Sequence, residues 1–182
     1  MHSASKYLCG HNDTVAGVIA HSQDAMAETL REAQKSEGAA LAPFDSWLVL
    51  RGVKTLALRM QRHQENGIAA AKFLQSHPKV EQVFYSGFQP HKQSRGSNGM
   101  VSFYLKDKSQ TPHILERVKM ILFAESLGGV ESLITYPLAQ THGAIPEAMR
   151  LSAGVDERLL RLSCGIESAE DIINDLGAAL DN

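Results

Sequence analysis

The spacing of hydrophobic and polar positions divides the chain into segments of different character. Apolar side chains recur every three or four positions over residues 43–78, which predicts one long helix that ends before Pro78. A similar pattern over 22–38 predicts a shorter helix, with Gly38 placed to end it. The short apolar run at 14–19 is typical of a buried strand.

Beyond Pro78 the pattern changes to short β-rich runs separated by helical segments. Helices are expected after Thr111-Pro112 and after Ser168, where cap residues precede apolar stripes. The connections are too short for every strand pair to be parallel, so an α/β domain over a mixed or antiparallel sheet is expected. Strands are predicted at 80–85, 100–105, 128–134 and 159–164.

This pattern predicts three parts. Residues 1–42 are interpreted as a piece of a larger domain, 43–78 as a connecting helix and 79–182 as a small α/β domain. We expect 79–182 to fold by itself, and 1–42 to be mobile, rearranged or covered by self-association.

Composition excludes several classes of function. The formal net charge is −2 and no long basic run occurs, which argues against nucleic acid as a partner. No apolar stretch approaches the roughly 20 residues that cross a bilayer, and no signal peptide is indicated, so no membrane partner is expected. Cys9 and Cys164 form no metal-ligand or redox motif, and free thiols are typical of a reducing compartment such as the cytoplasm. No metal site is predicted.

The segment around Lys6 has several interpretations. Ser3 and Lys6 fit the S-x-x-K motif of penicillin-binding enzymes, but the S-D-N and K-T-G motifs of that family do not occur. A solvated surface lysine is the ordinary alternative. A lysine amine can also bond covalently to an aldehyde cofactor. Ser3 and Ser5, two residues apart on one side of an extended chain, could then hold a phosphate.

A second group of candidates lies in the C-terminal part. Gly128 and Gly129 allow a close approach of backbone to a ligand. Arg161 lies in a predicted buried strand, and a buried arginine is rare unless it is paired. Its guanidinium could hold a carboxylate through two hydrogen bonds, or it could pair with an internal acidic residue.

Taken together, these segments resemble the Cys/Met-metabolism family of PLP-dependent enzymes, which includes cystathionine γ-synthases, cystathionine γ- and β-lyases and methionine γ-lyases. The matching motifs are collinear and span nearly the whole chain. They are HSASKYL with GHND (residues 2–13), PFD with LRGVKTL and RM (43–60), ESLGGVESL (125–133), TH (141–142) and RLSCGIE (161–167).

The resemblance implies roles for individual residues. Lys6 would bond to pyridoxal 5'-phosphate (PLP) and move protons at the substrate's α and β carbons, while Ser3 and Ser5 would hold the cofactor phosphate. Arg161 would bind the substrate's α-carboxylate, with Ser126 helping to place it and Glu125 bearing on substrate choice. The implied fold is the C-terminal portion of a fold-type-I PLP-dependent transferase.

The resemblance covers only the C-terminal half of such enzymes. It implies a carbon–sulfur lyase or γ-replacement enzyme of transsulfuration, acting on a sulfur-containing amino acid, that is incomplete and inactive alone. A homo-oligomer or a missing N-terminal half is the expected partner. The alternative is a non-catalytic truncated fragment that acts as an oligomerising or regulatory module.

Overall fold

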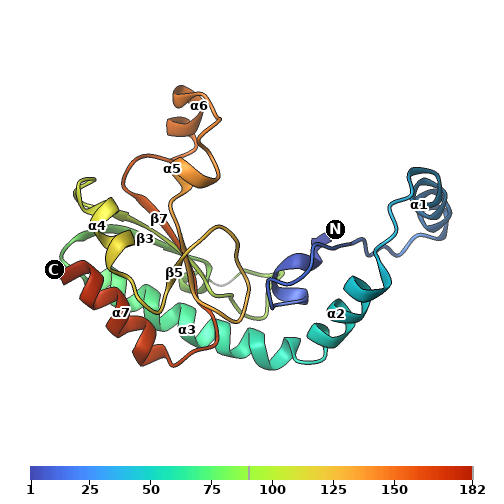
Figure 1. Cartoon of the computed structure of the whole chain (residues 1–182), viewed down its shortest axis with the longest axis horizontal. Helices are drawn as coiled ribbons and strands as arrows, with labels where there is room; N and C mark the ends of the chain where they lie inside the picture. Colours follow the sequence, from blue (N-terminus) through green and yellow to red (C-terminus); the bar gives the residue numbers. More distant parts are fainter. Residues whose placement is uncertain (90, 182) are drawn as a thin grey trace. The chain divides into compact units, whose positions relative to one another are not determined.

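The structure is a computed structural model that describes residues 1–89 and 91–181. It divides into two compact units, Met1–Leu56 and Ala57–Asn182 (Figure 1). No helix within the described residues is long and apolar enough to cross a bilayer.

Unit 1 contains one small two-stranded sheet and two helices. The strands pair antiparallel, with His2 opposite Val18 and Ser3 opposite Gly17. Between the strands the chain makes a compact turn that carries Lys6. The elements are β1 (His2–Ser3), β2 (Gly17–Val18), α1 (Asp24–Glu37) and α2 (Pro43–Val53).

Helix α1 agrees with the sequence pattern over 22–38. It ends where expected, because Gly38 adopts a left-handed conformation with φ of 70° that glycine tolerates without steric cost. None of its residues is buried, so α1 depends on its own backbone hydrogen bonds rather than on a core.

The segment 43–78 contains two helices where the apolar spacing predicts one. Helix α2 ends at Val53 and α3 (Leu56–Ser76) follows. At the break, the Thr55 N–H donates to the Gly52 carbonyl at 3.2 Å. A two-residue turn leaves the apolar periodicity almost unchanged, which is why the pattern does not reveal it.

Unit 2 is built on a mixed sheet, as the sequence predicts, but the sheet has five strands because residues 122–123, which the sequence pattern does not mark as a strand, pair with β6. The strand order is β3-β4-β7-β6-β5, and only β5 and β6 run parallel. The strands are β3 (Val80–Tyr85), β4 (Met100–Leu105), β5 (Leu122–Phe123), β6 (Leu133–Thr135) and β7 (Leu159–Ser163). The helices besides α3 are α4 (Gln110–Arg117), α5 (Pro137–Gln140), α6 (Glu147–Ser152) and α7 (Ala169–Asp181).

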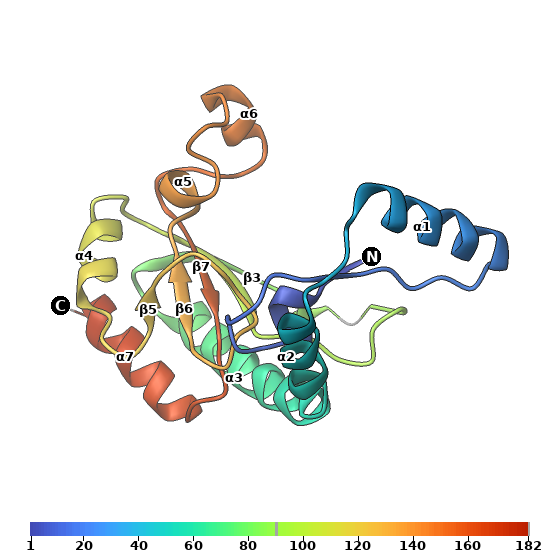
Figure 2. The same ribbon diagram turned by 45° about the vertical axis from the view of Figure 1, so that its right-hand side comes forward.

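The core of unit 2 lies between one face of this sheet and helices α3 and α7, which lie side by side in two views (Figure 2). On β4 the alternation is clear, because Val101, Phe103 and Leu105 are buried while Ser102 and Tyr104 are partly exposed. The opposite face of β4 therefore carries Met100, Ser102 and Tyr104. Arg161 occupies the β7 position directly opposite Ser102.

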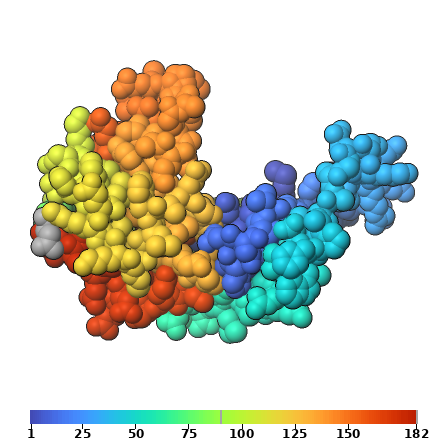
Figure 3. Space-filling model, viewed as in Figure 1, coloured from blue at the N-terminus to red at the C-terminus, as the bar shows by residue number. Residues whose placement is uncertain are grey.

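Two local predictions in unit 2 differ from the structure. The strand expected at 128–134 is confined to β6, and the residues before it form a loop. Helix α4 begins at Gln110, so Pro112 lies at its third position, where a missing N–H still costs no helical hydrogen bond. Helix α5 lies against β7, and the segment that follows it and carries α6, orange in Figure 3, projects from the rest of unit 2.

Candidate active site

The Lys6 turn in unit 1 has an unusual backbone. Residues Ala4–Leu8 form two helical turns that meet in a kink at Lys6, whose φ of −94° and ψ of −131° are not helical. The Cys9 N–H donates to the Ala4 carbonyl at 2.9 Å, and the Gly10 N–H donates to the Lys6 carbonyl at 2.8 Å. Ala4 is fully buried, so the kink is anchored at its start and the half-buried Lys6 side chain extends from it.

Ser5 joins this turn to the second strand segment through Ala16. Its Oγ accepts a hydrogen bond from the Ala16 N–H at 2.8 Å and donates to the Ala16 carbonyl at 3.3 Å. That carbonyl already accepts from the backbone N–H groups of Ala4 and Ser5. The long Ser5 hydroxyl bond is thus the one that could be given up to a stronger acceptor, such as a phosphate oxygen. Ser3, on β1, is exposed.

Helix α2 supports the turn from within unit 1. Its Gly52 lies so close to Cys9 that a Cβ at this position would be 2.2 Å from the Cys9 carbonyl oxygen. Thr14 donates from Oγ1 to Asp45 on the same helix at 2.7 Å. Two of the motif residues on α2, Asp45 and Gly52, therefore have a structural role: they bind the segment that follows Lys6 or allow α2 to approach it closely.

The second predicted group lies in unit 2 around Arg161. In the sheet Arg161 is directly opposite Ser102 on one side and Thr135 on the other. Its Nη2 donates to Thr135 Oγ1 at 3.3 Å and to the Ser126 carbonyl at 3.4 Å. Its Nε is buried and has no hydrogen-bond partner among the described residues.

The charge of Arg161 is only partly compensated. Burial lowers the pKa of its guanidinium, and the field of Glu125 opposes that shift. Glu125 is exposed, and within residues 1–89 and 91–181 no carboxylate forms an ion pair with Arg161. A partly buried cation held by neutral oxygens, with a buried Nε that lacks an acceptor among the described residues, is suited to receiving an anion.

The loop that carries Ser126 has a strained backbone and is held by hydrogen bonds to Ser163 and Glu167. Ser126 has φ of 146°, a conformation that costs a residue with a side chain about 1–3 kcal/mol. The Gly128 N–H donates to the buried Ser163 Oγ at 2.9 Å. Farther along, Glu167 accepts from Ser132 N–H at 2.6 Å and from Ser132 Oγ at 2.9 Å. These bonds fix the loop to the end of β7.

The predicted residues therefore form two groups: Ser3, Ser5 and Lys6 in unit 1, and Glu125, Ser126 and Arg161 in unit 2. Sequence reasoning gave no role to Thr135, which is hydrogen-bonded to Arg161, or to Ser163, which holds Gly128 in the loop that follows Ser126. Both lie in apolar runs typical of buried strands. Only strand register places Thr135 beside Arg161, whereas Ser163, two residues after Arg161 on β7, shares its face of the strand.

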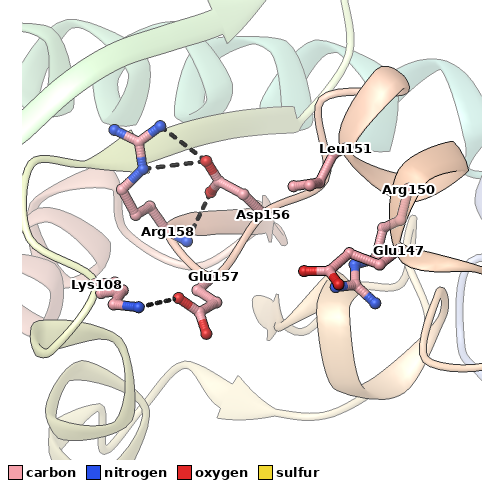
Figure 4. A pocket seen from close by; sticks show the side chains of 7 residues that line it. All are labelled: Lys108, Glu147, Arg150, Leu151, Asp156, Glu157 and Arg158. Carbon is pink, nitrogen blue, oxygen red and sulfur yellow. Dashed lines mark hydrogen bonds and ion pairs between the residues drawn. The ribbon is translucent and has the colours of Figure 1, made fainter.

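A hollow of about 290 Å³ lies elsewhere in unit 2, beside α6 and the start of β7 (Figure 4). Its charges largely satisfy one another. Arg158 pairs with Asp156 at 2.8 Å and also with Glu81, while Lys108 pairs with Glu157 at 2.6 Å. None of the predicted site residues lines it.

Comparison with known proteins agrees with the motifs. A sequence profile described as "Cys/Met metabolism PLP-dependent enzyme" matches residues 1–181. The chain therefore belongs to the Cys/Met-metabolism family of PLP-dependent enzymes.

Its relatives have related but different activities. Over the whole chain it is 48% identical to the cystathionine γ-synthase of Haemophilus influenzae, covering 47% of that protein. It is also 48% identical to the cystathionine β-lyase of Coxiella burnetii, with 98% of this chain and 49% of that protein covered. A crystal structure of Xanthomonas oryzae pv. oryzae cystathionine γ-synthase in complex with cystathionine superposes with a TM-score of 0.94. In that match the identity is 39%, and 99% of this chain and 49% of the other are covered.

The chain spans about half the length of the relatives it matches. The shared fold is thus the part of a PLP-dependent enzyme that carries both the Lys6 turn and the Arg161 strand.

Proposed function

We propose that this chain is part of a PLP-dependent transsulfuration enzyme that acts as a carbon–sulfur lyase or a γ-replacement enzyme on cystathionine-like amino acids. The observation that carries the proposal is the family match over residues 1–181, which includes both Lys6 and Arg161. Relatives of equal identity are a γ-synthase and a β-lyase. The proposal therefore rests on what the two names share, which is cystathionine, an amino acid with carbon–sulfur bonds, as product or substrate.

Lys6, Ser3 and Ser5 are the residues that would hold PLP. They supply an amine for the aldehyde carbon and two hydroxyls for the phosphate, and Ser5 has a weak hydrogen bond to exchange. When bound, PLP withdraws electrons from the carbon next to the substrate's amino group. The Lys6 amine would be the group that moves a proton at the substrate's α and β carbons.

Arg161 would bind the α-carboxylate of the substrate. The support is its unsatisfied Nε, its neutral oxygen partners and the lack of an ion pair among the described residues. The carbonyl of the strained Ser126 accepts a hydrogen bond from the same guanidinium, so Ser126 would help to place the carboxylate. The exposed Glu125 lies near enough for its charge to act on the guanidinium.

We further propose that the chain is incomplete as a catalyst. PLP chemistry requires protein groups that control the ring nitrogen and the ring plane, and none of Ser3, Ser5 and Lys6 has that role. The parts of the relatives outside the match, or a second copy of the chain, would supply them.

Reduction with borohydride in the presence of PLP tests the cofactor site. We expect mass spectrometry to locate the reduced adduct on Lys6, to find it absent in Lys6→Arg and to find it unchanged in Lys54→Arg, a matched control within unit 1. Label scattered over surface lysines would contradict the proposal. It would favour the alternative, a non-catalytic module.

A further inference from the structure

We infer that Thr135 is a positioning residue that orients the guanidinium of Arg161 for a carboxylate. The inference rests on the proposed function in that the anion it serves is the substrate's α-carboxylate. Thr135 is 1% exposed and lies directly across the β6–β7 ladder from Arg161. Its hydroxyl is thus fixed beside the arginine by backbone register and by burial.

The direction of the hydrogen bonds follows from the contacts. Thr135 Oγ1 donates its single proton to the Ala124 carbonyl at 3.0 Å. Its lone pairs are then left for the N–H of Arg161 Nη2 at 3.3 Å, since a guanidinium can only donate. The hydrogen bonds from Arg161 to Thr135 and from Thr135 to Ala124 can therefore run in only one direction. They end on the backbone that leads into Glu125 and Ser126.

A neutral acceptor at this position has a consequence for binding. A carboxylate there would pair with the guanidinium and compensate its charge. A hydroxyl holds one nitrogen in place and leaves the positive charge to the incoming anion. The buried Nε, without an acceptor among the described residues, gains from any ligand that supplies one, because an unsatisfied buried donor is unfavourable.

The test uses the N–H signal of Arg161 Nε in the ¹⁵N-labelled full chain, identified by its loss in Arg161→Lys. Thr135→Val keeps the shape of the side chain and removes the hydroxyl. We expect the solvent exchange rate of this N–H to rise about tenfold, because the guanidinium loses the Nη2 hydrogen bond that holds it in place and Nε then reaches solvent more often; one lost hydrogen bond has an effect of about this size. Thr135→Ser, which restores the hydroxyl, should stay close to the wild type.

A matched control separates positioning from general loosening. Thr111 is also 1% exposed and donates from Oγ1 to a carbonyl, that of Glu157, at 2.9 Å. Thr111→Val should lose similar stability and leave the Arg161 signal unchanged. If Thr135→Val does not fold, Thr135→Ala carries the same expectation.

Titration with L-cystathionine distinguishes this inference from the proposed function. A shift of the wild-type Arg161 signal supports carboxylate binding, and we expect about tenfold weaker binding in Thr135→Val. A wild-type signal that does not respond overturns the proposed carboxylate role. Unchanged exchange in Thr135→Val, or an equal rise in Thr135→Ser, overturns the positioning role whatever the titration gives.

Discussion

Replacing Gly52 by alanine sets two opposite effects against each other. Gly52 is the second-last residue of α2, where alanine is favoured over glycine by at most about 1 kcal/mol in helix propensity. The added Cβ would, however, lie 2.2 Å from the Cys9 carbonyl oxygen, whereas ordinary contact begins near 3.4 Å. Because the obstacle is backbone, α2 or the Lys6 turn must move by about 1 Å to relieve the overlap.

The sizes of the two effects decide whether Gly52→Ala raises or lowers the free energy of unfolding. Overpacking of about 3 kcal/mol against a gain of about 1 kcal/mol leaves unit 1 about 2 kcal/mol less stable in Gly52→Ala. The same substitution at Gly177, inside α7, places the Cβ at an ordinary 3.5 Å from the ring of Phe73. Gly177→Ala should therefore stabilise unit 2 by about 1 kcal/mol.

Urea unfolding of the full chain measures both effects. Trp47 lies on α2 and is the single tryptophan, so its fluorescence reports on unit 1, while far-ultraviolet circular dichroism is dominated by the larger unit 2. With a slope near 1 kcal/mol per molar, the fluorescence midpoint of Gly52→Ala should fall by about 2 M. If it stays or rises, as expected of the circular dichroism midpoint in Gly177→Ala, the close approach of α2 to Cys9 is refuted.

Three further predictions concern both units. Glu167→Ala removes the two hydrogen bonds to Ser132 and should cost about 3 kcal/mol in urea unfolding, against under about 1 kcal/mol for the exposed Glu170→Ala; similar losses would contradict the anchoring role. Burial lowers the pKa of His63 below 6.5, so the folded form favours the neutral imidazole. Stability is thus fully present above the unfolded value of 6.5 and falls as the pH drops through it toward the lower folded-state pKa. His63→Gln should flatten this dependence, and an unchanged slope would refute it. Trypsin should cut the unburied α1 at Lys35 before it cuts the packed α3 at Lys72, and simultaneous cleavage would show that α1 is as well protected as the core.

Much of the fold is readable from local sequence. Gly38 ends α1 because its left-handed conformation suits glycine, and the runs at 80–85 and 100–105 form β3 and β4. The loop before β6 was missed because its backbone is set by hydrogen bonds to Ser163 and Glu167, which are distant in sequence.

The sequence by itself determined the family and the α/β class with a mixed sheet, and it marked Lys6 and Arg161 as candidate site residues, because these inferences depend on residue types in order and on local periodicity. Tertiary structure decided which partners these residues have. Ser5 is hydrogen-bonded to Ala16, the lack of a side chain at Gly52 allows the Cys9 carbonyl to lie close to it, and strand register places Thr135 beside Arg161. Such pairings form between segments far apart in the chain, so neither spacing nor composition specifies them.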